Sequence, residues 1–223
     1  MIELLTHVIV LFTAFPVHEC AHAWAAEKMG DHTARNAGRI TLNPIKHLSL
    51  WGTLFMIFLG FGWANPVPVN PGNFKNPKKG MALTALAGPV SNLIMAFIAT
   101  VVFRVLYAVY YTSEAEMTLV YYLLIIFRYM IILNIGLAVF NLLPIPPLDG
   151  SRIFNLVMSD STYFKVMKYE RYIFLGLMAV IWLGLLDAPL AWLRSKALDC
   201  VFFLTDWVDY IMMFILGFGG ASV

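Results

Sequence analysis

The sequence predicts an all-α polytopic membrane protein, and three observations support this class. Hydrophobic residues make up 61% of the 223 residues. Charged residues make up only 13%, whereas soluble domains carry about 25%. Long apolar stretches recur along the chain, and a membrane-spanning helix needs about 20 such residues. We therefore expect one compact helical bundle in a lipid bilayer.

The apolar stretches predict five to six transmembrane helices. Long apolar stretches occupy residues 4–28, 81–111 and 117–142, and two more candidate spans are 172–187 and 199–218. The stretch 48–62 is short for a span and rich in glycine. We expect a membrane-inserted loop or β-hairpin region here, between the first and the next full span, and residues 38–42 have a strand-like composition. Non-helical backbone at this depth is tolerated where protein or a water-filled cavity covers it.

The basic residues predict the orientation in the membrane. If residues 48–62 do not cross, eleven Lys and Arg side chains lie on one side of the membrane and two on the other. If these residues cross, the split is six against seven. Cytoplasmic loops carry an excess of Lys and Arg, so the first arrangement is preferred. It places the N-terminus outside and the basic loops in the cytoplasm.

The first apolar stretch contains the motif His18-Glu19-Cys20-Ala21-His22. Residues four apart lie on one face of a helix, so both imidazoles can bind one metal ion. Zinc with an open coordination position lowers the pKa of a bound water to about 7, and Glu19 is placed to take a proton from that water. Because histidines and a carboxylate are costly in hydrocarbon, the motif favours a functional site over a packed polar helix face.

A second polar cluster follows the 117–142 helix, with the sequence Asn141-Leu-Leu-Pro-Ile-Pro-Pro-Leu-Asp149-Gly150. Its three prolines break the helix, so irregular backbone can carry Asp149 back into a cavity. The two histidines lie on the order of 10–15 Å from the cytoplasmic end of their helix. Asp149 can fold back to that depth. Asp149 would then complete a two-histidine, one-carboxylate zinc site. Alternatively, Leu-Asp-Gly is an ordinary turn, and His47 is the next candidate ligand.

Three motifs together resemble the site-2 protease family of intramembrane zinc metalloproteases, peptidase family M50. They are the HExxH motif, the segment Ala87-Gly88-Pro89-Val90-Ser91-Asn92, and the segment from Asn141 to Gly150. Residues 38–44 and 63–71 are similar to a short prokaryotic branch without PDZ or CBS domains. The resemblance covers most of residues 10–155.

The resemblance implies one Zn²⁺ per chain, held by His18, His22 and Asp149. It implies that Glu19 is the general base and that Asn141 holds the substrate carbonyl or oxyanion. We expect a single intramembrane metalloprotease domain over residues 1–223. Its catalytic core covers about residues 4–155, and the helices at about 172–218 are accessory.

The expected function is that of a zinc-dependent intramembrane endopeptidase, which cuts transmembrane segments of other membrane proteins near the cytoplasmic face, as in regulated intramembrane proteolysis. The expected partners are a transmembrane protein substrate and the lipid bilayer of a prokaryotic inner membrane. A net charge of +2 gives no basis for a nucleic-acid partner.

Two alternatives remain open. One is a non-catalytic homologue that retains zinc as a structural element and binds transmembrane helices, although a structural site needs no base such as Glu19. The other is a metal transporter, a class in which internal repeats are common, and the sequence shows no repeat.

Several other residues carry weaker expectations. Arg104 lies near the outer end of its helix and is expected to snorkel. Asn92 and Asn134 are expected to bond between helices. Residues 66–69, Pro-Val-Pro-Val, are either an edge strand for an extended substrate or a rigid extended loop.

Overall fold

The computed structural model of the chain describes residues 2–49, 52, 65–113 and 117–216. Regular structure in these residues is helical and includes no strand, which confirms the predicted all-α class. Two described helices are long and apolar enough to cross a membrane, α5 (Pro77–Thr112) and α6 (Thr118–Asn141). A third span results if α9 (Glu170–Trp182) and α10 (Asp187–Thr205), which meet at 87°, count as one broken span. The total of five to six spans therefore stays a prediction.

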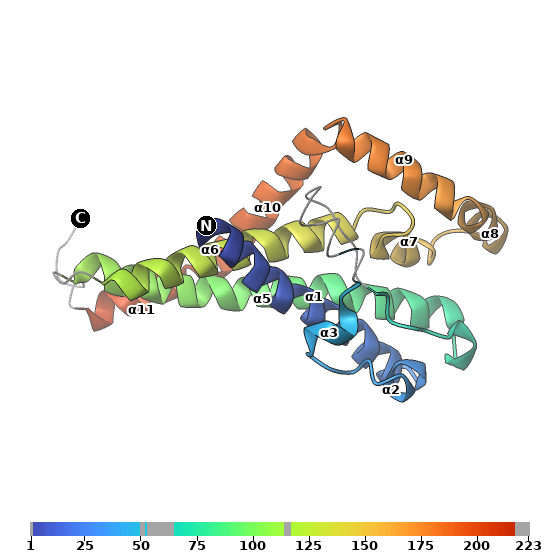
Figure 1. The fold of residues 1–223 in the computed structure, drawn as a ribbon, viewed down its shortest axis with the longest axis horizontal. Coiled ribbons are helices and arrows are strands. Elements are labelled where there is room, and N and C mark those ends of the chain that lie inside the picture. Colours follow the sequence, from blue (N-terminus) through green and yellow to red (C-terminus); the bar gives the residue numbers. More distant parts are fainter. Residues whose placement is uncertain (1, 50–51, 53–64, 114–116, 217–223) are drawn as a thin grey trace.

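Helices α5 and α6 run side by side in opposite directions, and α1 (Ile2–Lys28) crosses them (Figure 1). The buried core between α5, α6 and α10 consists of Ala96, Ala99, Ile131, Ile135 and Val201. Small residues such as the two alanines let helix backbones approach closely, which is the usual way in which helices pack in a membrane. This arrangement brings the middle of α1 against α5.

The first three predicted spans are helices, and α5 and α6, but not α1, are among the described helices long and apolar enough to cross a membrane. Predicted bounds of 4–28 and 117–142 compare with Ile2–Lys28 and Thr118–Asn141. The helix predicted at 81–111 begins four residues earlier, at Pro77. Proline is favoured at the first helical position, and the side chain of Asn76 caps the helix by accepting a hydrogen bond from Lys79 N at 3.1 Å.

The C-terminal helices differ from the predicted bounds. Gly184, with φ of 70°, ends the helix predicted at 172–187. The span predicted at 199–218 is not one helix, because the chain breaks at Asp206 between α10 and α11 (Trp207–Ile215).

Arg104 contacts this junction, contrary to the expectation that it snorkels. Its side chain on α5 is only 10% exposed, and it pairs with Asp206 at 2.6 Å and also with Asp209. Its Nε donates to Thr205 Oγ1 at 3.0 Å. The two carboxylates at the junction of α10 and α11 therefore pair with Arg104, so the guanidinium does not reach out to water.

A buried carboxylate organises the loop after α1. Asp31 is fully buried; its Oδ2 accepts from Asn70 N, and its Oδ1 accepts from Asn73 Nδ2, both at 2.7 Å. Oδ1 also accepts from the main chain and hydroxyl of Thr33. Burial raises the pKa of the Asp31 carboxyl, but these hydrogen bonds outweigh burial and hold the pKa below its usual value. The carboxylate thus joins the end of α1 to the segment that leads into α5.

The remaining elements of this loop are short, namely α2 (Thr33–Asn36), α3 (Pro44–His47) and η1 (Pro71–Asn73). The strand-like expectation for residues 38–42 was wrong, because these residues form turns and bends that follow Gly38, whose φ is 64°. Most of the segment 48–62, where a membrane-inserted loop or hairpin was predicted, lies outside the described residues.

Candidate metal centre

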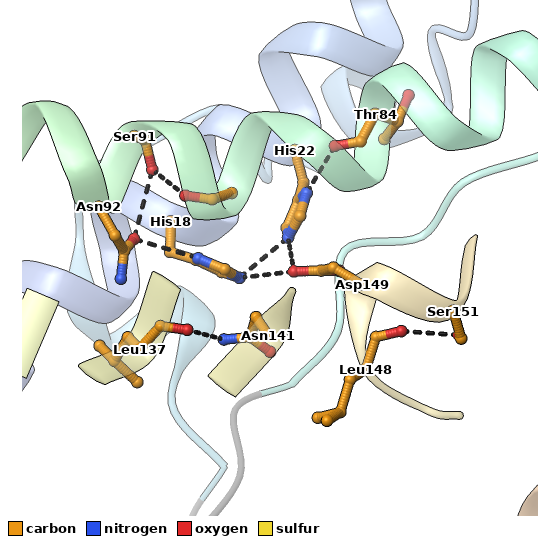
Figure 2. Close-up of polar contacts among 11 residues, drawn as sticks. His18, His22, Thr84, Ser91, Asn92, Leu137, Asn141, Leu148, Asp149 and Ser151 are labelled. Carbon is orange, nitrogen blue, oxygen red and sulfur yellow. Dashed lines mark hydrogen bonds and ion pairs between the residues drawn. The ribbon is translucent and has the colours of Figure 1, made fainter. Parts of the chain in front are cut away.

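Three side chains meet where α1, α5 and α7 (Asp149–Phe154) come together (Figure 2). The Nε2 atoms of His18 and His22 are 3.0 Å apart, and Oδ2 of Asp149 lies 3.3 Å from each of them. Among the described residues, these three form the group of His, Cys, Asp and Glu side chains whose ligand atoms all lie within 4.8 Å of one another. The fold therefore brings together all three ligands that the sequence predicted.

Helix periodicity places the two histidines on one face of α1. They are one turn apart, so their rings project in the same direction. The ring centroids are 4.5 Å apart with an interplanar angle of 88°. Both histidines are buried, and the face that carries them is covered by α5.

Two hydrogen-bond acceptors on α5 face the Nδ1 atoms of the two rings. His22 Nδ1 lies 2.7 Å from the carbonyl oxygen of Thr84, which can only accept. His18 Nδ1 lies 3.1 Å from Oδ1 of Asn92, which also accepts. A neutral imidazole with its proton on Nδ1 presents a lone pair at Nε2. With the proton on Nδ1, each Nε2 atom presents its lone pair to the point that it shares with Asp149.

The donor set fits one zinc ion. Tetrahedral zinc with bonds of about 2.0–2.2 Å separates its ligand atoms by about 3.3 Å, and the observed separations are 3.0 and 3.3 Å. Oδ2 of Asp149 is buried and has no hydrogen-bond donor among the described residues. Three lone pairs that converge in a buried site repel one another unless a cation lies among them. His18, His22 and Asp149 could therefore hold one metal ion.

Gly150 fixes the place where Asp149 enters the site. A Cβ at position 150 would overlap the main-chain carbonyls of Leu142 and Leu143, at the end of α6. Helix α7 can therefore begin against the last turn of α6 only with glycine at this position. Asp149 is the first residue of α7, so this close contact sets the position of its carboxylate.

Gly88 has the same role on α5. A Cβ at this position would overlap the ring of His22 and would lie 2.5 Å from Cε1 of His18. The absence of a side chain at position 88 lets the main chain of α5 lie against both imidazoles.

Glu19 lies beside the centre but outside the ligand group. It follows His18 on α1 and is half-buried. No hydrogen bond or ion pair joins its carboxylate to another residue in the described part of the chain. A half-buried carboxylate beside this group can accept a proton from water.

Two other predicted residues are placed differently. Asn141 is the last residue of α6, and its Nδ2 donates to the carbonyl oxygen of Leu137 at 3.0 Å (Figure 2). Its amide is therefore engaged by its own helix. His47 is fully buried in α3, its Nε2 lies 2.7 Å from the carbonyl oxygen of Thr41, and it is not part of the ligand group.

Sequence reasoning missed the contribution of Thr84 and Gly88. Gly88 belongs to a motif that carried the family resemblance, but neither residue received a role. The expected bond between helices is confirmed for Asn92, which reaches His18. Asn134 instead donates to the carbonyl oxygen of Met130 in its own helix. No local sequence pattern predicts that a main-chain carbonyl, such as that of Thr84, will bond to a histidine.

Comparisons with known proteins agree with this centre. The sequence profile described as Peptidase family M50 matches residues 113–185. The protein named "Putative zinc metalloprotease YwhC" of Bacillus subtilis (strain 168) is 44% identical over 183 residues, which cover 82% of this chain and 80% of that protein. "Putative zinc metalloprotease Rip2" of Mycolicibacterium smegmatis (strain ATCC 700084 / mc(2)155) is 30% identical over 143 residues, or 60% of this chain and 50% of that protein. No solved structure gives a significant match.

The similarity to YwhC extends over four fifths of both chains, which is enough to establish the family. The name of that relative identifies zinc as the cofactor and proteolysis as the activity. The apolar helices of the present chain identify a membrane protein. The chain therefore belongs to peptidase family M50, the site-2 protease family of zinc metalloproteases.

Proposed function

We propose that the protein is an intramembrane zinc endopeptidase that cuts transmembrane segments of membrane proteins near the cytoplasmic face. One observation carries the proposal. Three lone-pair atoms converge within 3.3 Å of one another, and a carboxylate without a partner among the described residues follows immediately on the same helix. This is the combination of ligands and base that hydrolysis of a peptide bond needs.

His18, His22 and Asp149 are proposed as the zinc ligands. When bound, zinc supplies Lewis-acid activation of water and of the scissile carbonyl. Glu19 accepts the proton of the attacking water and later returns it to the leaving amine, as a general base and then a general acid. The Thr84 carbonyl holds the ring of His22 so that its Nε2 faces the site.

Asn141 is proposed to hold the substrate carbonyl or oxyanion. Its position at the end of α6 places it beside the segment that leads to Asp149. Its amide nitrogen donates to Leu137 O at 3.0 Å, so it must exchange that bond for one to the substrate. Exchange of one hydrogen bond for another of equal kind has a small net energy.

The segment 65–70 supports a binding mode for an unwound substrate. Asn65 is tied to α3, since its N donates to His47 O at 2.7 Å, and Asn70 is tied to Asp31. The four residues between these anchors form neither helix nor strand. Val67 and Val69 retain main-chain donors that an extended peptide can pair with, as in recognition by strand addition.

The proposed sidedness rests on charge and depth. Eleven basic residues share one side of the membrane if residues 48–62 do not cross, which marks that side as cytoplasmic. Helix α1 ends at Lys28, six residues beyond His22. The metal centre is then on the order of 10–15 Å from that end of the helix.

The decisive experiment compares wild type with Glu19→Gln in detergent. Zinc content and cleavage of a model transmembrane substrate are measured on the same preparations. We expect about one zinc per chain in both proteins, and no cleavage by the variant, because Glu19 is not a ligand. Substantial cleavage by purified Glu19→Gln would remove Glu19 from the mechanism and favour the scaffold or transporter alternatives.

A further inference from the structure

Helix α5 holds the two histidines of the centre in different ways. His22 faces a main-chain carbonyl, that of Thr84, at 2.7 Å. His18 depends on a side chain, because its Nδ1 faces Oδ1 of Asn92 at 3.1 Å. A main-chain carbonyl is present whichever residue stands at position 84, whereas only some residue types offer an acceptor at position 92. The state of His18 is therefore sensitive to substitution at position 92.

We propose that Asn92 is a positioning residue that selects the tautomer of His18. Its Oδ1 accepts the proton on Nδ1 and so reserves the Nε2 lone pair for the metal. The inference rests on the proposed zinc site and extends it to a residue with no assigned role. Partners of this kind fix the tautomer and the ring orientation of ligating histidines, and their loss typically lowers metal affinity about 10–100-fold.

The competing tautomer has a partner of its own. Nε2 of His18 lies 3.0 Å from Nε2 of His22, and the latter presents a lone pair because the Thr84 carbonyl keeps the His22 proton on Nδ1. If the proton of His18 moved to Nε2, it could bond to His22 or to Oδ2 of Asp149, which lies 3.3 Å away, and it would block one ligand atom. In the metal-free protein, Asn92 therefore disfavours the tautomer of His18 that carries its proton on Nε2.

The surroundings of Asn92 leave its Oδ1 available to accept a hydrogen bond from His18. The side chain is fully buried and lies one turn after Gly88 on the same face of α5. The hydroxyl of Ser91 donates to the Gly88 carbonyl at 2.7 Å and is 3.4 Å from Asn92 Oδ1, so His18 is the closer partner of this oxygen. The amide nitrogen of Asn92 has no acceptor among the described residues. Only the acceptor half of the amide is in use, which predicts that aspartate can replace it.

The test uses zinc affinity, measured by competition with a chelator, in the Glu19→Gln background so that proteolysis does not interfere. We expect Asn92→Leu, which removes the acceptor, to bind zinc about 10–100-fold more weakly. Asn92→Asp, which keeps an acceptor, should stay within about threefold of the parent. Asn134→Leu is the matched control, because Asn134 is also fully buried but bonds to Met130 within α6. This control should leave the zinc affinity unchanged.

A second measurement does not depend on zinc. Nitrogen-15 NMR of labelled histidine in the metal-free protein identifies the tautomer of His18, with its signal assigned from His18→Asn. The proton should be on Nδ1 in wild type and in Asn92→Asp, and on Nε2 in Asn92→Leu.

Three results would overturn the role of Asn92. They are a wild-type His18 with its proton on Nε2, parental zinc affinity in Asn92→Leu, and equal losses of affinity in the Leu and Asp variants. The last result would indicate a packing role. If wild type bound no zinc, the proposed function would fail, but the NMR measurement would still decide the role of Asn92.

Discussion

The main chain of Gly88 on α5 lies so close to the imidazole of His22 on α1 that a Cβ at position 88 would overlap the ring. A helix that approaches a metal centre this closely acts as one of its walls. The same helix supplies the Thr84 carbonyl and the Asn92 amide that hold the two rings. The close packing of α5 against α1 therefore determines where both rings lie.

Gly88→Ala should weaken zinc binding at least about 10-fold, because the new methyl group displaces a ligand ring or separates the two helices. It should also lower the free energy of unfolding by about 1–3 kcal/mol through overpacking. Chelator competition and thermal unfolding in detergent check both effects. Gly176→Ala is the control, since a Cβ at position 176 in α9 meets nothing within 4 Å. Unchanged zinc affinity in Gly88→Ala would contradict the contact.

Asp149→Asn should lower zinc occupancy and cleavage together. The substitution keeps the shape of the side chain but removes the negative charge of the carboxylate ligand and so weakens its bond to zinc. Metal analysis of this variant beside Glu19→Gln, which should lose cleavage alone, separates a ligand from a base. Asp199→Asn, at an exposed carboxylate in α10, should change neither. Full zinc and normal cleavage in Asp149→Asn would make Asp149 a turn residue.

The Asp31 carboxylate should make stability depend on pH. Its pKa in the folded protein is below the usual value, so its contribution is present above about pH 4 and falls as the pH drops towards the folded-state pKa. Asp31→Asn should cost about 1–3 kcal/mol at pH 7. Thermal unfolding at several pH values should show the difference between wild type and variant shrinking below about pH 4. A difference that stays constant with pH would exclude the ionised carboxylate as its source.

Arg104→Met should destabilise the docking of the C-terminal helices without changing zinc content. The substitution removes the contacts with Asp206, Asp209 and Thr205 together. Because both carboxylates are half-exposed, the cost should stay below the ~3–5 kcal/mol of a fully buried pair. Asp206→Asn should cost less than about 1 kcal/mol, because that carboxylate is 52% exposed. Position 104 is about 24 Å along α5 from Gly88. Loss of zinc in folded Arg104→Met would show that the two regions are coupled.

Labelling of introduced cysteines should establish the sidedness. In a background with Cys20 and Cys200 replaced by alanine, a cysteine at position 113 should react with an impermeant thiol reagent from outside. A cysteine at position 75, beside the basic cluster before α5, should react only after permeabilisation. External labelling at position 75 would mean that residues 48–62 cross the membrane and that the proposed cytoplasmic location of the centre is wrong.

Short-range features of this protein follow from its sequence. The apolar stretches at 4–28, 81–111 and 117–142 predict three helices because helix formation in a membrane depends on local hydrophobicity and internal hydrogen bonds. The placing of His18 and His22 on one face, with Glu19 beside them, follows from the repeat of the α-helix. The sequence predicted that Asp149 approaches the two histidines, from their shared depth in the membrane and from the family resemblance. In the structure its Oδ2 lies 3.3 Å from Nε2 of each histidine.

Contacts between segments distant in the chain were decided only by the tertiary structure. Nothing near position 104 in the sequence indicates Asp206 and Asp209, and nothing near position 84 marks its carbonyl as the partner of His22. Residues 38–42 form a turn and bends and not the predicted strand, because β-propensity depends on packing context. Hydropathy and periodicity describe which face of a helix is apolar. The neighbour of each polar atom depends on how the helices pack, which is a property of the whole chain.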